Sequence, residues 1–257
     1  MNKKKTVFVI ALALISAAAL IRQCVNWSSA RSSSAVHGDI TVLRLGIVNS
    51  FLVKGHDGLI VIDAGEAGNE YRIVREIMRQ GFQPTQVRLI VITHGHLDHY
   101  GSASGLRRIT GAPIAAHEGD VYYMNRGEYA PVHPRCMTGE LIKFFFINDR
   151  KKAVGVRSDI VIGDVLDLRA YGVEGKVIAT PGHTYGSVSV MLDNGDCIAG
   201  DTVMDYVCPD YAVFAQDKGM LRNSVRLLAG LKPKRIFLSH GETCDASVLD
   251  SISRSNP

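Results

Sequence analysis

Three histidines and one aspartate lie between His94 and His99, a stretch of six residues. They follow residues 87–92, an apolar run with the composition of a buried strand. Imidazole and carboxylate groups beside a buried strand need partners, because an unpaired polar group in apolar surroundings is costly. These groups are also the preferred ligands of zinc and related divalent metals. The segment therefore predicts a metal site rather than a polar loop with chance histidines.

The spacing within this segment suggests how it could serve more than one ion. Side chains alternate along an extended chain, so we expect His94, His96 and Asp98 on one side. His99 breaks the alternation and is expected to point elsewhere. One short loop could then contribute ligands to two adjacent metal positions.

The elements that must position further ligands follow downstream. Residues 176–179 form a predicted strand that ends in a Pro-Gly turn and His183. A predicted hairpin, 187–192 and 196–199, delivers Asp201, and a last strand, 235–238, ends before His240. A predicted helix over residues 218–230 connects these last two strands. Four strand ends therefore carry candidate metal ligands.

Upstream, the predicted strand 59–62 ends at Asp63. A helix is predicted over 71–80, a short helix over 102–109 and a strand over 113–117. From its position alone, Asp63 could cap the next helix.

The order of these residues resembles the His-x-His-x-Asp-His signature of the metallo-β-lactamase superfamily and its later ligands, over residues 40–242. The resemblance implies an α/β fold, a four-layer αβ/βα sandwich in which two mixed sheets pack together between outer helices. It also implies that Asp201 bridges two metals and that Asp63 supports the metal loop. The remaining ligands it implies are His94, His96 and His183 for one metal, and Asp98, His99 and His240 for the other.

The implied chemistry is hydrolysis. Three neutral imidazoles leave an open position on a tetrahedral zinc, which is typical of a catalytic site. Zinc lowers the pKa of bound water to about 7, so a metal-bound hydroxide could attack a carbonyl or a phosphorus atom. Asp98 is the candidate catalytic residue that orients this nucleophile and shuttles its proton. We expect two Zn²⁺ per chain, with Mn²⁺ or Fe²⁺ also compatible with the ligands.

The substrate class is less constrained, because a fold does not determine a substrate. The aspartate at position 201 makes the chain resemble lactonases, thioesterases of the glyoxalase II kind and phosphodiesterases, which typically have an aspartate at this position. True metallo-β-lactamases usually have cysteine or serine there. With little sequence after His240, we expect no separate glutathione-binding domain. The expected substrate is an ester, lactone, thioester or β-lactam-like amide. The alternatives are a phosphodiesterase, a mononuclear iron sulfur dioxygenase and a non-catalytic metal-binding module.

The chain has 257 residues, 46% of them hydrophobic, and a formal net charge of +4, as expected of an ordinary globular protein. No basic stripe with interleaved aromatics is present, so we expect a small-molecule substrate and no nucleic acid. Residues 1–24, with three lysines before an apolar run, resemble a signal peptide or a membrane anchor. Residues 25–36 are predicted to be a Ser-rich tether and 37–257 the hydrolase domain. This arrangement predicts a secreted, periplasmic or membrane-anchored protein, with membrane contact only through the N-terminal segment if that segment is not cleaved.

Residues 119–160 are irregular and rich in aromatics, so they either pack on the core or form a wall or lid over the site. Tyr185 and Tyr206 lie near ligands in sequence and could donate to an oxyanion. Among the cysteines, Cys136 and Cys208 could form a disulfide or remain free thiols. The other histidines are interpreted as structural: His37, His56, His117 and His133.

Overall fold

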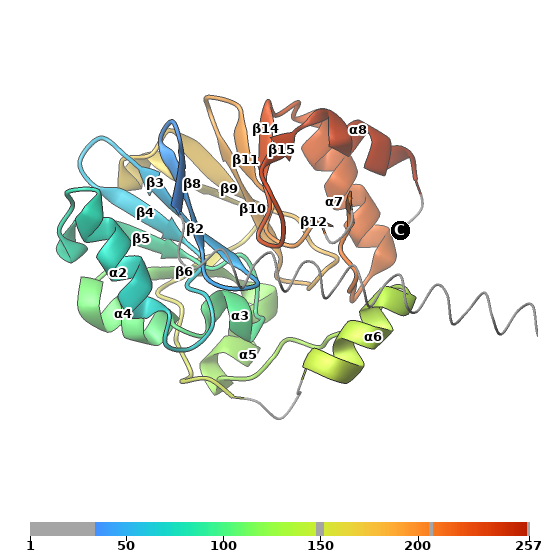
Figure 1. The fold of residues 1–257 in the computed structure, drawn as a ribbon, viewed down its shortest axis with the longest axis horizontal. Helices are drawn as coiled ribbons and strands as arrows, with labels where there is room; N and C mark the ends of the chain where they lie inside the picture. The colour runs from blue at the N-terminus through green and yellow to red at the C-terminus, as the bar shows by residue number, and fades with distance from the viewer. Residues whose placement is uncertain (1–33, 148–151, 206–207, 256–257) are drawn as a thin grey trace, which may run out of the picture.

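The computed structural model describes residues 34–147, 152–205 and 208–255. Two mixed sheets form its centre (Figure 1). The first sheet is antiparallel from β1 to β4 and parallel from β4 to β7. Its strands, in spatial order, are β1 (Ser34–His37), β2 (Ile40–Arg44), β3 (Asn49–Lys54), β4 (Leu59–Ile62), β5 (Val87–Val91), β6 (Ile114–His117) and β7 (Ile160–Ile162).

The second sheet is built from the later part of the chain. Its strands, in spatial order, are β15 (Cys244–Asp245), β14 (Arg235–Phe237), β11 (Asp196–Ile198), β10 (Val188–Leu192), β9 (Gly175–Ala179) and β8 (Val165–Asp167). Strands β11 and β14 are parallel, and the other pairs are antiparallel. A small separate sheet pairs β12 (Val203–Asp205) with β13 (Pro209–Tyr211).

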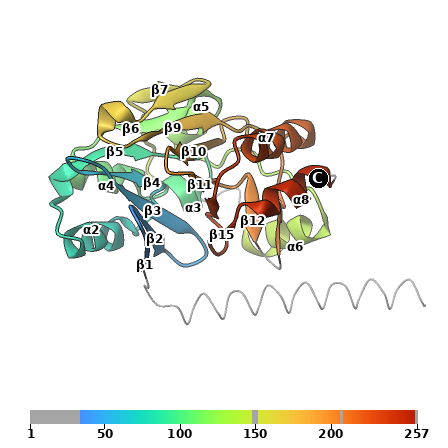
Figure 2. The same ribbon diagram turned by 90° about the horizontal axis from the view of Figure 1, so that it is seen from above.

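Helices cover the outer faces of both sheets (Figures 1 and 2). Helices α2 and α4 lie beside the first sheet, and α7 and α8 lie beside the second. The helices are α2 (Glu70–Arg79), α3 (Leu97–Tyr100), α4 (Ala103–Thr110), α5 (Glu118–Arg126), α6 (Met137–Phe146), α7 (Lys218–Gly230) and α8 (Ser247–Arg254), with 3₁₀ turns at Pro84–Gln86 and Arg169–Tyr171.

Alternation along the strands divides the interior into layers. In β4, Leu59 and Val61 belong to the core under α2 and α4, whereas Ile60 and Ile62 face the core between the two sheets. A third core fills the space between the second sheet and α7 and α8. The order helix, sheet, sheet, helix confirms the four-layer αβ/βα sandwich.

Local signals account for the element boundaries. Helix α2 puts Ile73 and Ile77 on its buried face, one turn apart. Helix α7 begins at its N-cap Asp217, whose carboxylate accepts a hydrogen bond from the backbone N–H of Met220. The predicted helix over residues 218–230 is therefore confirmed.

The structure corrects the domain boundary drawn from sequence. Ser34–His37 form the edge strand β1, which pairs with β2, so the last residues of the predicted tether belong to the first sheet. The Ser34 hydroxyl also accepts a hydrogen bond from Arg79. Serine-rich composition concealed this strand, because its pairing depends on the backbone rather than on its side chains.

The predicted targeting segment, residues 1–24, lies outside the described residues, as does most of the tether. Within the described ranges, none of the helices has the length and hydropathy needed to cross a membrane. Cys136, Cys197, Cys208 and Cys244 are free thiols, so the structure does not contain the possible disulfide between Cys136 and Cys208.

Candidate metal centre

The loops at one edge of the two sheets carry all the predicted ligands. The His-rich loop follows β5, His183 follows β9, Asp201 follows β11 and His240 follows β14. Strands β9, β11 and β14 run in the same direction, so their carboxyl ends meet at one edge of the second sheet. Helix α3, which begins inside the His-rich loop, marks this end of the molecule in Figure 1.

The seven predicted ligands form two groups. In each group, the candidate ligand atoms lie within 4.8 Å of one another. The first group is His94, His96, His183 and Asp201, and the second is Asp98, His99 and His240. This division matches the one that the family resemblance implied. All seven residues singled out from the sequence lie in the cluster.

Three ring nitrogens of the first group face a common point. Nε2 of His94 lies 3.0 Å from Nδ1 of His96 and 3.2 Å from Nε2 of His183. Nδ1 of His96 lies 3.1 Å from Nε2 of His183. Because converging lone pairs repel one another, this triangle fits a cation better than mutual hydrogen bonds.

The second group combines one carboxylate with two imidazoles. Oδ2 of Asp98 lies 3.2 Å from Nε2 of His240 and 3.6 Å from Nε2 of His99. The two Nε2 atoms are 3.3 Å apart. Asp98 is the most exposed of the seven residues, so it lies on the open side of the cluster.

Asp201 lies between the two groups. Its Oδ2 is 3.7 Å from Nε2 of His94 and 3.4 Å from Nε2 of His183. The same oxygen is 3.6 Å from Nε2 of His99 and 3.5 Å from Nε2 of His240. Its Oδ1 is buried without a hydrogen-bond partner among the described residues. One carboxylate therefore faces both groups, as a ligand shared by two ions would.

Outer hydrogen bonds fix which ring nitrogen faces the centre. Nδ1 of His183 donates to the Phe214 carbonyl at 3.0 Å, and Nδ1 of His240 donates to the Ile47 carbonyl at 2.7 Å. A carbonyl can only accept, so the proton is on Nδ1 and the Nε2 lone pair is free to bind a metal.

Burial and mutual charge set the protonation of the cluster. Burial lowers the pKa of His94 well below its usual value and that of His96 to about 3. Burial disfavours the charged forms of Asp98 and Asp201, but the neighbouring imidazoles outweigh it and lower both carboxyl pKa values. Burial likewise opposes a charge on His99, yet Asp201 and Asp98 raise its pKa well above the usual range. A metal bound at His99 would displace this proton.

The donor groups of the cluster suit metal ions. The cluster offers buried imidazole lone pairs, two ionised carboxylates and an unpartnered carboxylate oxygen. Such groups are costly to bury together unless a cation compensates them. The residues present therefore fit two adjacent divalent ions.

One geometric expectation from sequence is wrong. The alternation of an extended chain was expected to place Asp98 beside His94 and His96, but Asp98 belongs to the other group. The chain is extended at His96 and turns into helix α3 at Leu97, so Asp98 and His99 are successive helical residues. The helical turn sends both side chains toward the second group.

Asp63 contacts the metal loop directly. Its Oδ1 accepts the backbone N–H of Thr93 at 2.8 Å, and its Oδ2 accepts the Thr93 hydroxyl at 2.8 Å. Oδ2 also accepts Nδ1 of His99 at 2.8 Å. Asp63 is fully buried and has a positive φ of 60°, a conformation that costs energy for any residue with a Cβ. The contacts favour the supporting role over the helix-cap interpretation.

Sequence reasoning missed Asp120. This buried residue of α5 accepts the Gly95 N–H at 2.7 Å and the Thr184 hydroxyl at 2.6 Å through Oδ2. Gly95 lies between His94 and His96, and Thr184 follows His183. Asp120 therefore joins the two loops of the first group. Its only sequence signal is an acidic residue early in a helix, which usually indicates a favourable helix dipole contact.

A cavity of about 100 Å³ opens onto the cluster. Its floor includes His96, Asp98, Asp201 and His240, and Tyr129, Val132, Ile142 and Ile147 contribute to its walls. The described residues of segment 119–160, which include most of α5 and all of α6, therefore contribute to the walls of this cavity, as one of the two sequence interpretations proposed. The segment does not bury all of its aromatics, because Phe144 and Phe145 are 80% and 68% exposed.

The remaining candidates lie elsewhere. Tyr185 is exposed and absent from the cavity lining, and Tyr206 lies outside the described residues. The ring of Tyr129, by contrast, lies 5.8 Å from that of His96. His37 packs edge-on against Phe237, and Nδ1 of His117 accepts a hydrogen bond from a backbone N–H in the first turn of α5.

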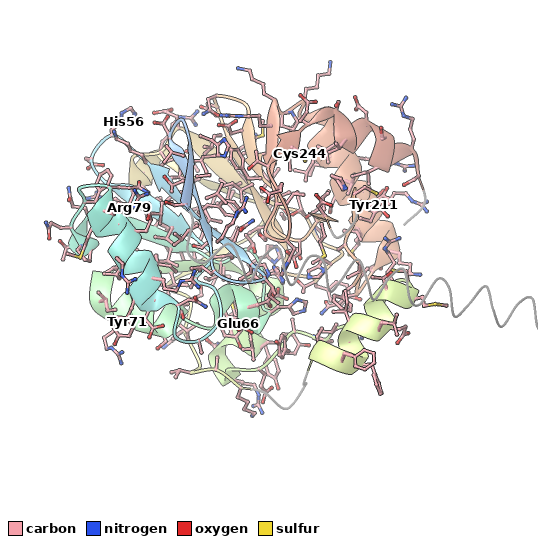
Figure 3. The ribbon with its side chains drawn as sticks, in the orientation of Figure 1. His56, Glu66, Tyr71, Arg79, Tyr211 and Cys244 are labelled. Carbon is pink, nitrogen blue, oxygen red and sulfur yellow. The ribbon has the colours of Figure 1, made fainter. Side chains whose placement is uncertain are left out.

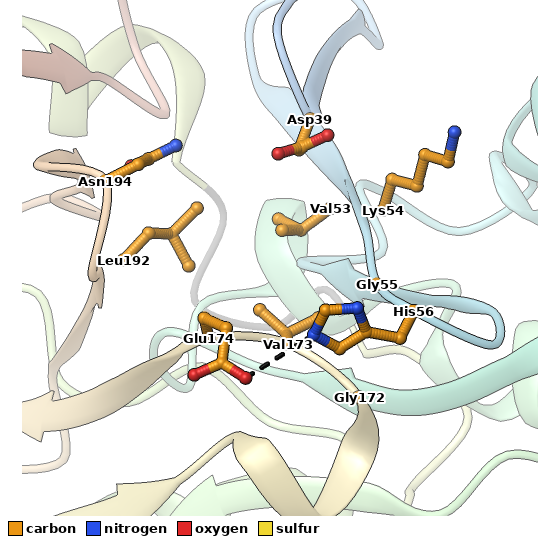
Figure 4. A pocket seen from close by; sticks show the side chains of 10 residues that line it. All are labelled: Asp39, Val53, Lys54, Gly55, His56, Gly172, Val173, Glu174, Leu192 and Asn194. Carbon is orange, nitrogen blue, oxygen red and sulfur yellow. Dashed lines mark hydrogen bonds and ion pairs between the residues drawn. The ribbon is translucent and has the colours of Figure 1, made fainter.

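His56 and His133 also lie outside the cluster. His133 lines a neighbouring cavity. His56 and Glu174 line another cavity of about 180 Å³ (Figure 4), where Nε2 of His56 lies 3.4 Å from Oε1 of Glu174. Figure 3 shows His56 at the opposite end of the sheets from Glu66, which lines the cavity at the metal cluster.

Comparison with known proteins gives matches over most of the chain. The profile of the metallo-beta-lactamase superfamily matches residues 43–240. A probable metallo-hydrolase of Methanocaldococcus jannaschii is 30% identical over 201 residues, covering 77% of this chain and 89% of that protein. A probable metallo-hydrolase of Bacillus subtilis is 26% identical over 234 residues, covering 82% of this chain and 85% of that protein. A hydroxyacylglutathione hydrolase of Cereibacter sphaeroides is 27% identical over 206 residues, covering 79% of this chain and 66% of that protein.

Solved structures agree on the fold. The Rm3 metallo-beta-lactamase superposes with a TM-score of 0.64 at 22% identity, covering 84% of this chain and 81% of that one. The MIM-2 metallo-beta-lactamase gives a TM-score of 0.62 at 18% identity, covering 86% and 80%. With the four-layer fold, the two ligand groups and these relatives together, the chain belongs to the metallo-β-lactamase superfamily and is a hydrolase of that superfamily.

Proposed function

We propose that this protein is a dinuclear zinc hydrolase that cleaves a carboxylic ester, lactone or thioester. The observation that carries the proposal is Asp201, whose Oδ2 lies 3.4–3.7 Å from imidazoles of both ligand groups. A site for one structural ion would need neither a second group nor a shared carboxylate. The superfamily membership supports hydrolysis as the reaction class.

The donor set supports zinc as the metal. His94, His96 and His183 would hold one ion, and Asp98, His99 and His240 the other, with Asp201 shared. Imidazole-rich sites suit zinc, while the carboxylates keep Mn²⁺ and Fe²⁺ possible. When bound, two zinc ions supply a nucleophilic hydroxide at neutral pH and stabilise negative charge on the carbonyl oxygen.

The chain's own residues orient the reaction. Asp98 borders the cavity on the open side of the cluster, so its carboxylate can hold the attacking water and accept its proton. Tyr129 and Val132 form a wall that keeps bulk water from one side of the reacting carbonyl. Oδ2 of Asp98 and Nε2 of His240 lie 3.2 Å apart and would bind the same ion, which would fix the orientation of that carboxylate.

Thioesters belong to the proposed range because one relative carries the name hydroxyacylglutathione hydrolase. A phosphodiesterase or an iron-dependent sulfur dioxygenase would use similar ligands. The sharing of Asp201 between two groups favours a dinuclear hydrolase over a mononuclear oxygenase. We also propose a small-molecule substrate, and export or anchoring through residues 1–24, which fractionation of tagged cells would test.

The experiment is metal analysis combined with a substrate panel. The purified chain would be tested with a chromogenic ester, a lactone, a thioester, a phosphodiester and a cephalosporin. About two zinc ions per chain and chelator-sensitive cleavage of a carbonyl substrate would support the proposal. One iron per chain with oxygen uptake and no hydrolysis would refute it. Asp250→Asn, an exposed substitution on α8, serves as the control variant beside Asp98→Ala.

A further inference from the structure

The walls of the cavity above the metal cluster are mostly apolar, and Tyr129 and Glu66 are the polar exceptions. Six aliphatic, thioether or aromatic side chains from five separate segments face it. They are Ile47, Val132, Ile142, Ile147, Met204 and Phe214. Apart from the cluster itself, these side chains can offer a substrate only dispersion contacts and exclusion of water.

Outside the imidazoles of the cluster, the charged side chains that line the cavity are carboxylates. They belong to Glu66, Asp98 and Asp201, and none of the described lining residues is lysine or arginine. A carboxylate held in this cavity away from the metals would therefore meet no positive charge among the described lining residues. An anion buried without such a partner loses its hydration with little compensation.

Two described cations, Lys143 and Lys152, line a separate cavity of about 280 Å³, which also has Tyr129 and Val132 in its lining. Nζ of Lys143 donates to the Val132 carbonyl at 2.8 Å. Nζ of Lys152 donates to Oε1 of Glu128 at 2.9 Å. Both ammonium groups therefore already have hydrogen-bond partners, and neither lysine lines the cavity at the metal cluster.

We propose that the acyl group cleaved by this enzyme is short, apolar and uncharged at its far end. This inference rests on the proposed hydrolase function and deepens it. The cavity of about 100 Å³ is small beside the 300–1,000 Å³ that is typical of sites for drug-sized ligands, which favours a short acyl chain.

The test compares two esters that differ only at the far end of the acyl chain. 4-Nitrophenyl hexanoate ends in a methyl group, and 4-nitrophenyl hydrogen adipate has a carboxylate in its place. With zinc-loaded full-length enzyme, kcat/KM should favour the hexanoate by about 100-fold or more after subtraction of the enzyme-free rate. 4-Nitrophenyl decanoate should also be cleaved more slowly than the hexanoate.

A charge placed on the wall should reverse part of this preference. Ile47 is 48% exposed at the cavity, so Ile47→Lys can be accommodated without burying its ammonium group. The variant should raise the adipate-to-hexanoate ratio of kcat/KM by about tenfold, because it supplies the missing cation. Ile47→Met, a neutral side chain of similar reach, should keep the wild-type ratio.

The outcomes separate this inference from the function beneath it. Equal or preferred cleavage of the adipate ester would overturn the inference and leave the hydrolase intact. An identical adipate-to-hexanoate ratio for Ile47→Lys and Ile47→Met would overturn it as well. Cleavage of neither ester, nor of any other carbonyl substrate in the panel, would overturn the proposed function and this inference with it.

Discussion

Oδ2 of Asp63 lies 2.8 Å from Nδ1 of His99, and both side chains are fully buried. The carboxylate holds the imidazole in the tautomer that turns Nε2 toward Asp98 and His240. Because Asp63 also accepts the Thr93 N–H, one side chain fixes both the start of the metal loop and a ligand near its end.

Asp63→Asn should weaken metal binding at the second group while preserving the backbone. Asparagine tolerates the positive φ of residue 63 better than most residues, so the fold should remain. The amide offers one acceptor in place of two, which leaves either His99 or Thr93 without a partner. We expect the Kd for the metal at the second group to rise about 10–100-fold, measured by zinc titration against a competing chelator. An unchanged Kd would show that Asp63 is only a structural residue.

Asp98→Ala should remove turnover and keep the fold. Asp98 lies at the cavity and provides the only carboxylate of the second group. Loss of a proton acceptor and a metal ligand should lower kcat by about 10²–10⁴-fold. Circular dichroism and the melting temperature of the chelated protein should match those of the control Asp250→Asn. Retention of wild-type kcat would contradict the dinuclear mechanism.

Asp120→Ala should affect the first group more than the second. The substitution leaves the buried Gly95 N–H without its acceptor, at a cost of about 1–3 kcal/mol, and turns the Thr184 hydroxyl over to Ser187 alone. Since both donors belong to loops of the first group, zinc affinity there should fall, the reverse of the Asp63→Asn pattern. Calorimetric titration that resolves two binding steps would show which one weakens. Equal weakening of both steps would mean a general loss of packing.

Two truncations test the corrected domain boundary. Removing residues 1–33 leaves β1 complete, so melting temperature and activity should equal those of the full chain. Removing residues 1–36 deletes most of β1 and exposes the backbone edge of β2. The shorter protein should melt several degrees lower, which differential scanning fluorimetry can measure. Identical melting of both truncations would favour the boundary at residue 37 instead.

Metal removal should lower stability as well as activity. The first group places three imidazole nitrogens 3.0–3.2 Å apart. A bound cation offsets the repulsion between their lone pairs, and a chelator that removes the cation restores that repulsion. Zinc at 1,000 times its Kd would stabilise the folded state by about 4 kcal/mol. Melting scans with and without excess chelator should therefore separate clearly. Coincident scans would indicate that the centre forms without metal.

The sequence was most informative where one local signal acts alone. The α7 boundaries could be predicted from apolar spacing, and the ligand residues from their positions at strand ends. The order of strands in the two sheets could not, because register between distant segments depends on contacts that no local pattern records. The family resemblance supplied that architecture.

The differences between expectation and structure have physical causes too. Asp98 belongs to the second group because helix α3 starts at Leu97, and a helix of four residues leaves no periodicity to detect. Asp120 gives no clear signal because its partners are a backbone N–H and a threonine hydroxyl far away in the sequence. Tyr129 lies at the site and Tyr185 does not. The expectation for Tyr185 rested on its closeness to a ligand in sequence, which is a poor guide to distance in space.

The division of the ligands between the two sheets sets an order of events during synthesis. The loop containing His94 and Asp98 follows β5 of the first sheet, whereas His183 and Asp201 come from the second. The ribosome releases the first sheet with incomplete sets of ligands for both ions. Neither ion can gain its complete set of ligands until the second sheet has docked, and bound ions would then link the two halves of the chain.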